Sequence, residues 1–377
     1  MKIVLPTKKL IESLDIASRF VSKNATLPIL QNIYMKASID TLTIRATDME
    51  KYVEIQLPCE IKLEGAITVN AKMLSDIIST IEQPETEITV EQQNYVMTIS
   101  AGKDTFEING IPASEYVALP DMPQENSITL DANTFHEGVK KVEYAITEKS
   151  FSPVLTGVLV KNDADTIVFA GTDSFRLVEF KIKSAENADP FQLVIPKVAI
   201  NDIANIASYS IEKEANDINI QYSNNLIAFS FEADNMKILA TSLLIQGNFP
   251  DYQKEEIMPT QFNGKIILDK AQCEKAIKKI GILTRDINNF IQVDTDEDSI
   301  TISSGKTDKG KGKTTIPAII EGEPSSFGIN GKYITDFIKH ITSENLVFNI
   351  VDSQKPIIIM DQNQDNYKYV VRPLLNS

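Results

Sequence analysis

Hydrophobic positions repeat at the same spacing in three parts of the chain. In each part, one apolar residue is followed by others at offsets of 5, 9 and 12, with mostly polar residues between them. Positions at these offsets lie on one face of a helix with 3.6 residues per turn. The pattern therefore predicts three amphipathic helices that begin at matching points. The residues are Leu5, Leu10, Leu14 and Ala17; Leu130, Phe135, Val139 and Val142; and Leu268, Cys273, Ile277 and Ile280.

The residues before these helices include capping side chains. Asp131 and Asp269 stand where an N-cap would be, and Thr7 is the corresponding candidate in the first copy. A second helix pattern also recurs, because 69–78 closely parallels 329–338 and 195–204 keeps the same apolar stripe. Alternating stretches such as 32–36 and 41–46 have the period of strands. Helices are predicted at 7–23, 71–81, 132–149, 197–208, 270–285 and 332–340.

A third correspondence links the first two copies, because 28–30 (PIL) stands 19 residues before 47–48 (TD) and 153–155 (PVL) stands 19 residues before 172–173 (TD). Three correspondences in the same order indicate a triplicated unit of about 125 residues. We predict an α+β fold with three domains, 1–125, 126–259 and 260–377, each with two helices packed on antiparallel sheet. The stretches 120–125 and 254–261 are the expected linkers. Unpaired sheet edges favour pairing between consecutive copies, and a head-to-tail dimer could close six domains into a ring. Phe106, Ile108, Ile282 and Leu283 are candidates for the contact between chains, although ordinary core positions would also suit them.

The net charge of −15 argues against a protein that is basic over most of its surface. The six predicted helices are different, because they hold sixteen basic and nine acidic residues. A basic helical surface on an acidic body suits duplex DNA, whose phosphates carry no sequence information. A solvated helix face is the usual alternative for any one of these runs. The candidate DNA-facing residues are Lys23, Lys72, Lys140, Lys141, Lys149, Lys197, Lys275, Lys278, Lys279, Arg285 and Lys332.

The chain contains few of the residue types that most often serve in catalysis or bind metals. There are only two histidines, His136 and His340, and two cysteines, Cys59 and Cys273. The glycine-rich stretch 305–312 lacks the Ser or Thr that a phosphate-binding loop needs, and we interpret it as a basic hairpin tip. No apolar run is long enough for a membrane span, and the N-terminus lacks the apolar core of a signal peptide. We therefore expect a cytoplasmic protein without cofactor, metal or catalytic residues.

Several segments resemble the bacterial β sliding clamp family, the processivity subunit of DNA polymerase III. They are 26–30 (TLPIL), 172–177 (TDSFRL), 249–252 (FPDY) and 369–374 (YVVRPL), and the resemblance covers the whole chain. It implies three clamp-type domains per chain and a homodimeric ring of six domains around duplex DNA. It also implies docking of DNA polymerase III and other proteins with a clamp-binding motif, through a Gln-led hydrophobic peptide. A separate clamp loader would open the ring.

The resemblance places the peptide in a hydrophobic cleft between the second and third domains. Carried over residue by residue, it implies a cleft made of Leu155, Thr172, Ser174, Phe175, Arg176, Leu177, Pro250, Tyr333, Val370, Val371, Pro373 and Leu374. An apolar groove with a few polar groups suits such a peptide. The chain departs from the family at Ser174-Phe175, at Arg372 and in its last three residues. It also has Asn24 where the family uses an arginine.

Two hypotheses from different classes follow. The first is a non-catalytic sliding clamp that tethers the replicative polymerase to its template. The alternative is a repetitive β-rich scaffold that binds peptides without encircling DNA; a hydrolase with scattered carboxylates is a more remote third. The oligomeric state discriminates between the first two, because a salt-stable monomer would count against a ring.

Overall fold

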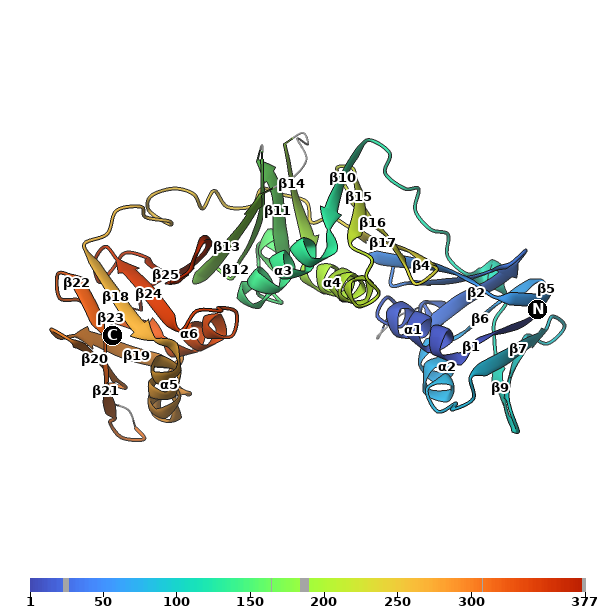
Figure 1. The fold of residues 1–377 in the computed structure, drawn as a ribbon, viewed down its shortest axis with the longest axis horizontal. Helices are drawn as coiled ribbons and strands as arrows, with labels where there is room; N and C mark the ends of the chain where they lie inside the picture. Colours follow the sequence, from blue (N-terminus) through green and yellow to red (C-terminus); the bar gives the residue numbers. More distant parts are fainter. Residues whose placement is uncertain (23–26, 164, 184–189, 307, 375–377) are drawn as a thin grey trace. The chain divides into compact units, whose positions relative to one another are not determined.

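The structure of the chain is a computed structural model that describes residues 1–22, 27–163, 165–183, 190–306 and 308–374. It contains two compact units, coloured along the chain in Figure 1. Unit 1 comprises Met1–Glu137 and Val198–Ile245, and unit 2 comprises Gly138–Lys197 and Gln246–Ser377. Each unit combines helices with antiparallel sheets, which confirms the α+β prediction.

Unit 1 contains two antiparallel sheets. The first sheet has, in spatial order, β5 (Glu60–Leu63), β1 (Lys2–Pro6), β7 (Glu85–Glu91), β8 (Val96–Ala101) and β9 (Asp104–Asn109). The second has β10 (Asn126–Asp131), β15 (Asp217–Tyr222), β16 (Leu226–Ala233), β17 (Met236–Leu243), β4 (Lys51–Pro58), β3 (Thr41–Thr47), β2 (Asn32–Ser38) and β6 (Gly65–Asn70).

Unit 2 also contains two antiparallel sheets. The larger has β14 (Phe191–Pro196), β11 (Gly157–Asp163), β12 (Thr166–Thr172), β13 (Arg176–Lys183), β26 (Gln364–Val371), β25 (Ile357–Asp361), β24 (Asn345–Ile350), β18 (Gly264–Asp269) and β22 (Ile319–Gly322). The smaller has β21 (Lys313–Pro317), β20 (Ser299–Ser303), β19 (Phe290–Thr295) and β23 (Ser326–Asn330).

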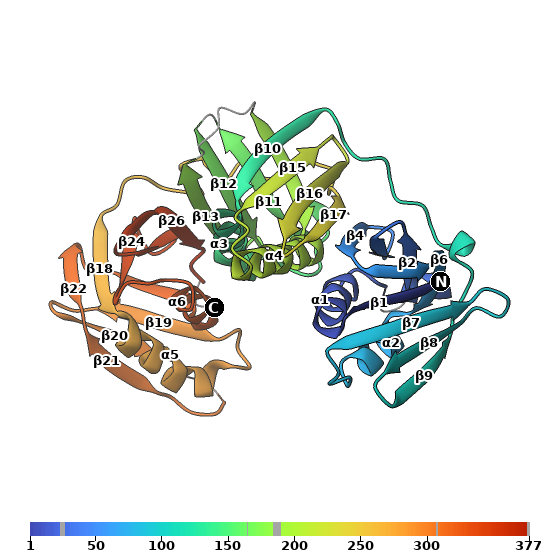
Figure 2. The same ribbon diagram turned by 45° about the vertical axis from the view of Figure 1, so that its right-hand side comes forward.

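Helices form at all six predicted places. They are α1 (Thr7–Ala17), α2 (Ala71–Ile78), α3 (Ala132–Val142), α4 (Lys197–Glu212), α5 (Lys270–Thr284) and α6 (Gly331–Ile338). Both α1 and α3 end earlier than predicted, and α4 continues further. Figure 2 shows α5 lying across β19, β20 and β21, which it contacts along the smaller sheet of unit 2.

The repeated apolar stripes are the inner faces of α1, α3 and α5 and of the strand ends before them. All twelve residues of the three stripes are at most 7% exposed. A face that is buried at the same offsets in three places confirms the helical interpretation of the repeat. The apolar stripe predicted this burial because most of the stability of a helix in a protein comes from packing its apolar face against the core.

Two of the three predicted caps form. The carboxylate of Asp131 accepts a hydrogen bond from the backbone N–H of Thr134 at 2.9 Å, and that of Asp269 accepts one from Gln272 at 2.7 Å. The Thr7 prediction is wrong, because Pro6 occupies the N-cap position of α1. Thr7 is instead buried, and its hydroxyl hydrogen-bonds to the hydroxyl of Thr86 at 2.8 Å.

Sheet edges of consecutive copies pair inside each unit. In unit 1, β4 of the first copy pairs with β17 of the second, with Tyr52 opposite Thr241. In unit 2, β13 of the second copy pairs with β26 of the third, with Leu177 opposite Val370. These two ladders satisfy backbone groups that a lone repeat would leave exposed, as the edge argument predicted.

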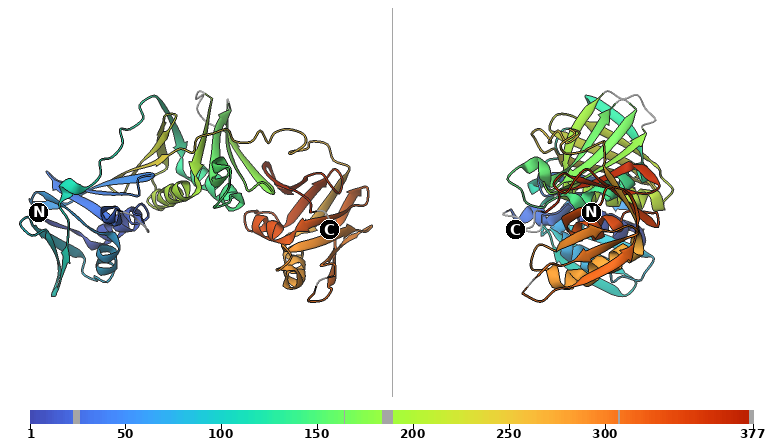
Figure 3. Two further views of the ribbon diagram at one scale, coloured as in Figure 1. Left: turned by 180° about the vertical axis from the view of Figure 1, so that it is seen from behind. Right: turned by 90° about the vertical axis from the view of Figure 1, so that its left-hand side faces the viewer.

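Both expected linkers lack helix and strand over 120–125 and 254–261. The second belongs to a longer stretch of the same kind, 244–263, which Figure 3 shows as an extended connection leading to β18. Among the helices of the described part of the chain, none is long and apolar enough to span a membrane.

Candidate binding cleft

A tight turn between β12 and β13 forms one wall of the cleft in unit 2. The carboxylate of Asp173 accepts hydrogen bonds from the backbone N–H groups of Phe175 at 3.0 Å and Arg176 at 2.9 Å. Ser174 has a φ of +78°, a conformation that few non-glycine residues adopt. The turn leaves the Phe175 side chain 55% exposed at the cleft.

The Arg176 side chain ties this turn to α6. Its guanidinium donates to Asp173 at 2.9 Å and to Asp336 at 3.0 Å. It also donates to the carbonyl oxygen of Tyr144 at 2.8 Å and lies 4.5 Å from the ring centroid of Tyr333. Its donors are thus engaged by the protein, and its charge is balanced by two carboxylates.

The pKa of Asp336 reflects this pairing. Burial alone would raise the pKa of the carboxyl, but hydrogen bonds from Arg176 and Lys332 outweigh it and lower the pKa below its ordinary value. Asp336 is therefore charged at neutral pH, and its ion pair with Arg176 persists.

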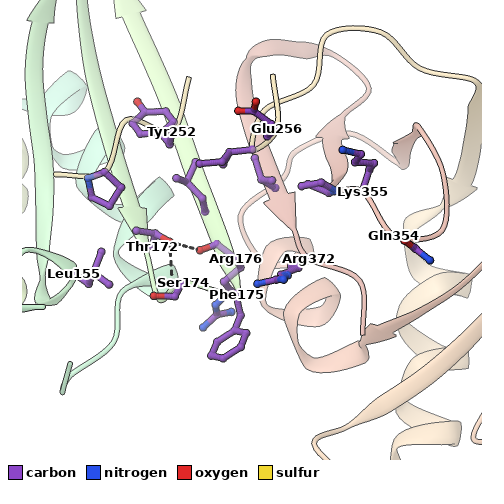
Figure 4. Close-up of a pocket in the computed structure, with 15 residues that line it drawn as sticks. Leu155, Thr172, Ser174, Phe175, Arg176, Tyr252, Glu256, Gln354, Lys355 and Arg372 are labelled. Atoms are coloured by element: carbon purple, nitrogen blue, oxygen red, sulfur yellow. Dashed lines mark hydrogen bonds between the residues drawn. The ribbon is translucent and has the colours of Figure 1, made fainter. Parts of the chain in front are cut away.

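The cleft itself is a cavity of about 520 Å³ that lies within unit 2 (Figure 4). Eight residues predicted from the family resemblance line it: Leu155, Thr172, Ser174, Phe175, Arg176, Leu177, Pro250 and Val370. Its lining also includes Tyr252, Glu256, Ile257, Gln354, Lys355, Pro356 and Arg372. The structure thus brings together residues that are up to 217 positions apart in the sequence, from Leu155 to Arg372.

Four predicted cleft residues do not line the cavity of the described structure: Tyr333, Val371, Pro373 and Leu374. Successive side chains of a strand point to opposite faces, so Val370 and Arg372 reach the cleft while Val371 is fully buried behind it. The Tyr333 ring contacts the Arg176 guanidinium, whose carbon lies 4.5 Å from the ring centroid, but it does not line the cavity. Leu374 pairs with Gly328 through an N–H to carbonyl bond of 2.9 Å.

Sequence reasoning missed seven of the lining residues for two reasons. Tyr252 and Arg372 belong to segments that carry the family resemblance, so their neighbours were a usable signal. Gln354, Lys355 and Pro356 form a turn before β25, and nothing in their local sequence connects them with Leu155 or Thr172. Only the pairing of β13 with β26 brings that turn to the cleft.

Unit 1 contains a second copy of the same turn, between β3 and β4. Asp48 accepts from the backbone N–H groups of Glu50 at 3.0 Å and Lys51 at 2.9 Å, and Met49 has a φ of +79°. Lys51 takes the place of Arg176, since its ammonium donates to the carbonyl of Arg19 at 2.7 Å and pairs with Asp202. The turn is therefore a repeated device that ties a sheet edge to the second helix of the next copy.

The two turns differ in the side chain that follows the Lys51 or Arg176 position. Tyr52 stands where the turn of unit 2 has Leu177, and its hydroxyl donates to the carbonyl of Met49 at 3.0 Å. A larger side chain thus occupies the position that lines the cleft in unit 2. The repeat explains the scaffold of the cleft, and the substitutions within it explain its shape.

Seven of the predicted DNA-facing residues have exposed side chains: Lys72, Lys149, Lys275, Lys278, Lys279, Arg285 and Lys332. Some of them pair with an acid four residues away on the same helix: Lys72 with Asp76, Lys278 with Glu274 and Lys332 with Asp336. Pairs near the surface such as Lys72–Asp76 and Lys278–Glu274 are weak, so phosphates could compete for these lysines, whereas Asp336 is buried and also pairs with Arg176. Their role as DNA contacts stays a prediction.

The other four basic residues are less accessible or not described. Lys140 and Lys197 are half-buried; Lys140 pairs with Glu143 at 2.9 Å, and Lys197 donates to the carbonyl of Ile146 at 3.1 Å. Lys23 lies outside the described residues.

The DNA-facing prediction for Lys141 is wrong in this structure. The residue is only 7% exposed, and its ammonium donates to the carbonyl of His340 and to Gln364. It also lies 4.5 Å from the ring centroid of Tyr367. Its position on the inner face of α3 fits the helical period, because Lys141 follows the buried Gly138 by three residues and so lies on the same face.

The four residues predicted to form the contact between chains also differ in exposure. Phe106 on the edge strand β9 and Ile282 on α5 are exposed, by 37% and 63%, and Leu283 is half-buried. Ile108 is buried in unit 1, because it pairs with Met97 on the inner face of the sheet. The Ile108 side chain is therefore part of the core of unit 1, and its place in a contact between chains stays a prediction.

Comparison with known proteins supplies the family. Models of the DNA polymerase III beta subunit match the chain at 1–120 (N-terminal domain), 129–251 (central domain) and 255–375 (C-terminal domain). The beta sliding clamps of Synechococcus elongatus and Bacillus subtilis are 26% and 28% identical to it, each over 99% of both chains.

A solved structure agrees with these matches. The crystal structure of the DNA polymerase sliding clamp from Bacillus subtilis superposes with a TM-score of 0.90 and 26% identity, covering 100% of both chains. The fold, the order of the three matched domains and the curated relatives all indicate the same family. The chain therefore belongs to the DNA polymerase III beta subunit family and has the sliding-clamp function of that family.

Proposed function

We propose that two copies of the chain join head to tail in a ring of six domains that encloses duplex DNA. The observation that carries the proposal is the repeated pairing of sheet edges, β4 with β17 and β13 with β26, between consecutive copies. The edge strands β9 and β21 have no partner on one side in the described sheets, so the same kind of pairing can join two chains. Phe106, Ile282 and Leu283 would contribute apolar contacts there.

The three domains of the proposed ring are 1–125, 126–259 and 260–377. The exposed basic residues of α2, α5 and α6 would contact phosphates, together with Lys149 and Arg285. Contacts of this kind are individually weak and independent of sequence, so the ring can slide.

The cleft of unit 2 would bind DNA polymerase III and other partners through a short hydrophobic peptide. Its lining supports this, because Leu155, Leu177 and Val370 offer apolar contacts beside the hydroxyl groups of Thr172 and Ser174. The ring then acts as a tether in the cytoplasm: it raises the effective concentration of the polymerase at its template and performs no chemistry itself. A separate loader would open the ring.

Enclosure is tested by topology. The protein is loaded onto nicked circular DNA with a clamp loader, separated from free protein by gel filtration, and the DNA is then linearised. We expect nearly all of the bound protein to leave once the DNA has ends, because nothing but the closed ring holds it. Retention on linear DNA, or a salt-stable 42 kDa monomer by light scattering, would contradict the ring and favour the scaffold alternative.

Reversing three exposed charges of α5 tests the DNA contacts. The triple variant Lys275→Glu, Lys278→Glu, Lys279→Glu is expected to load onto circular DNA about tenfold less well at low salt, because three phosphate contacts become repulsive. Peptide binding at the cleft should not change. The matched control is Lys36→Glu, Lys183→Glu, Lys237→Glu, which alters the net charge equally at exposed strand positions. Equal loss in both triples would show that only net charge matters.

A further inference from the structure

A groove between the two helices of the third copy carries positive charge only. α5 and α6 lie side by side in unit 2 (Figure 2), and a cavity of about 450 Å³ opens between them. The charged residues that line it are Lys278, Arg285 and Lys332, and no Asp or Glu of the described chain is among its lining residues. In a protein with a net charge of −15, a groove of this kind attracts an anionic ligand.

The inner part of the groove has open space and an unsatisfied hydroxyl group. A Cβ atom added at Gly281 of α5 would meet nothing within 4 Å, so the groove is open beside this residue. Thr284 also lines the groove and is fully buried, and its hydroxyl has no hydrogen-bond partner in the part of the chain that the structure describes. A buried hydroxyl without a partner is costly, and a ligand oxygen would satisfy it.

The first copy has the corresponding groove with different chemistry. A cavity of about 450 Å³ also lies between α1 and α2 in unit 1. By the offsets of the repeat, Val21 stands there in place of Thr284, and Ser22 in place of Arg285. The repeated fold thus supplies the groove, and two substitutions in the third copy add a buried hydroxyl and a cation to it.

The acid that would neutralise the groove is also held elsewhere in the third copy. In the first copy, Asp76 lines the groove and pairs with Lys72 at 2.6 Å. Asp336 is the corresponding acid of α6, but it is buried, pairs with Arg176 at 3.0 Å and does not line the groove. Lys332 shares this carboxylate, and its side chain remains exposed at the groove.

We propose that the groove between α5 and α6 binds a nucleoside polyphosphate. The phosphates would meet the three cations, and the Thr284 hydroxyl would donate to a phosphate oxygen. The open space beside Gly281 and the side chain of Ile282, which is 63% exposed, would receive the base. The volume suits a ligand of this size and far exceeds that of one phosphate. The site goes beyond the proposed DNA contacts, because a duplex reaches only the exposed cations at the rim.

Isothermal titration calorimetry of the full chain with ATP, adenosine and sodium phosphate, each in EDTA, tests the site. We expect ATP to bind at least about tenfold more tightly than either of the other two, since only ATP uses both the cations and the apolar space. The double variant Thr284→Val, Arg285→Ser gives the groove the residues of the first copy and should weaken ATP binding at least about tenfold. Its urea midpoint should not fall, because the variant removes an unsatisfied buried hydroxyl.

A second variant tests the groove by its shape. Gly281→Leu fills the open space and should weaken ATP binding about as much as the double variant does, without changing any charge. Because Ile282 is also a proposed contact between chains, light scattering checks that each variant keeps the oligomeric state of the wild-type protein. Unchanged ATP affinity in a folded Gly281→Leu protein would contradict the proposed site.

The matched control for charge is Lys36→Ser, which removes one cation from an exposed strand position and should leave ATP affinity unchanged. An equal loss of ATP affinity in Lys36→Ser and in the double variant would show that only net charge matters, and it would overturn the inference. Failure of the wild-type protein to bind ATP would overturn it as well. If that protein still loads onto circular DNA, the proposed clamp function stands and the groove cations serve DNA alone.

Discussion

Replacing Arg176 with alanine is expected to weaken peptide binding at the cleft by at least about tenfold and to lower stability by about 2 kcal/mol. The guanidinium holds the turn that presents Ser174 and Phe175, and it does so through Asp173, Asp336 and the carbonyl of Tyr144. Without it, Lys332 and Lys339 are the cationic partners that the buried carboxylate of Asp336 keeps among the residues that the structure describes. Fluorescence anisotropy and urea denaturation measure the two effects.

The repeat supplies the controls for this prediction. Arg176→Lys should restore only part of the lost binding, because Lys51 makes two of the equivalent contacts in the turn of unit 1 but one ammonium cannot bond Asp173, Asp336 and the carbonyl of Tyr144 together. Lys51→Ala removes the same device from unit 1, so it should lower stability without changing peptide affinity. If Lys51→Ala weakens peptide binding as much as Arg176→Ala does, the loss reflects general destabilisation, and Arg176 has no positioning role at the cleft.

The second large effect concerns Asp361, at the end of β25. Asp361→Asn is expected to lower the free energy of unfolding by about 2 kcal/mol at pH 7. The side chain is buried, and its carboxylate accepts hydrogen bonds from Thr342 at 2.8 Å and Asn363 at 3.0 Å. These bonds fix the hairpin that leads into β26, the strand that carries Val370 to the cleft.

The pH dependence of this effect has a definite sign. Burial alone would raise the pKa of Asp361, but hydrogen bonds from Ser343, Asn363 and Thr342 outweigh it and lower the pKa from 3.8 to about 2. Because the folded-state pKa is depressed, the stabilisation is complete well above pH 4 and is lost as the pH falls towards 2. The difference between wild type and Asp361→Asn should therefore shrink by about half at pH 3.

Urea denaturation at a series of pH values measures that difference. Asp365→Asn is the matched control, since it removes the same charge from an exposed position on β26 and should cost less than about 0.5 kcal/mol. A stability difference for Asp361→Asn that stays constant between pH 7 and pH 3 would contradict the assigned pKa and its cause.

The sequence by itself determined the repeat, the six helices and their buried faces. Leu10, Phe135 and Cys273 share one offset and one environment because burial of an amphipathic helix face depends on local periodicity, which is written in the sequence. The caps at Asp131 and Asp269 were predictable for the same reason, since a capping side chain bonds to an N–H only a few residues away.

Only the tertiary structure decided which side chains share a surface. Lys141, Ile108 and Val371 have the expected residue types, yet each is buried, because one step along a helix or strand moves a side chain to another face. Lys355 reaches the cleft only through the pairing of β13 with β26, a long-range contact without a local sequence signal. Local periodicity thus fixed the elements of this protein, while the pairing of distant strands assembled the cleft and selected its charged residues.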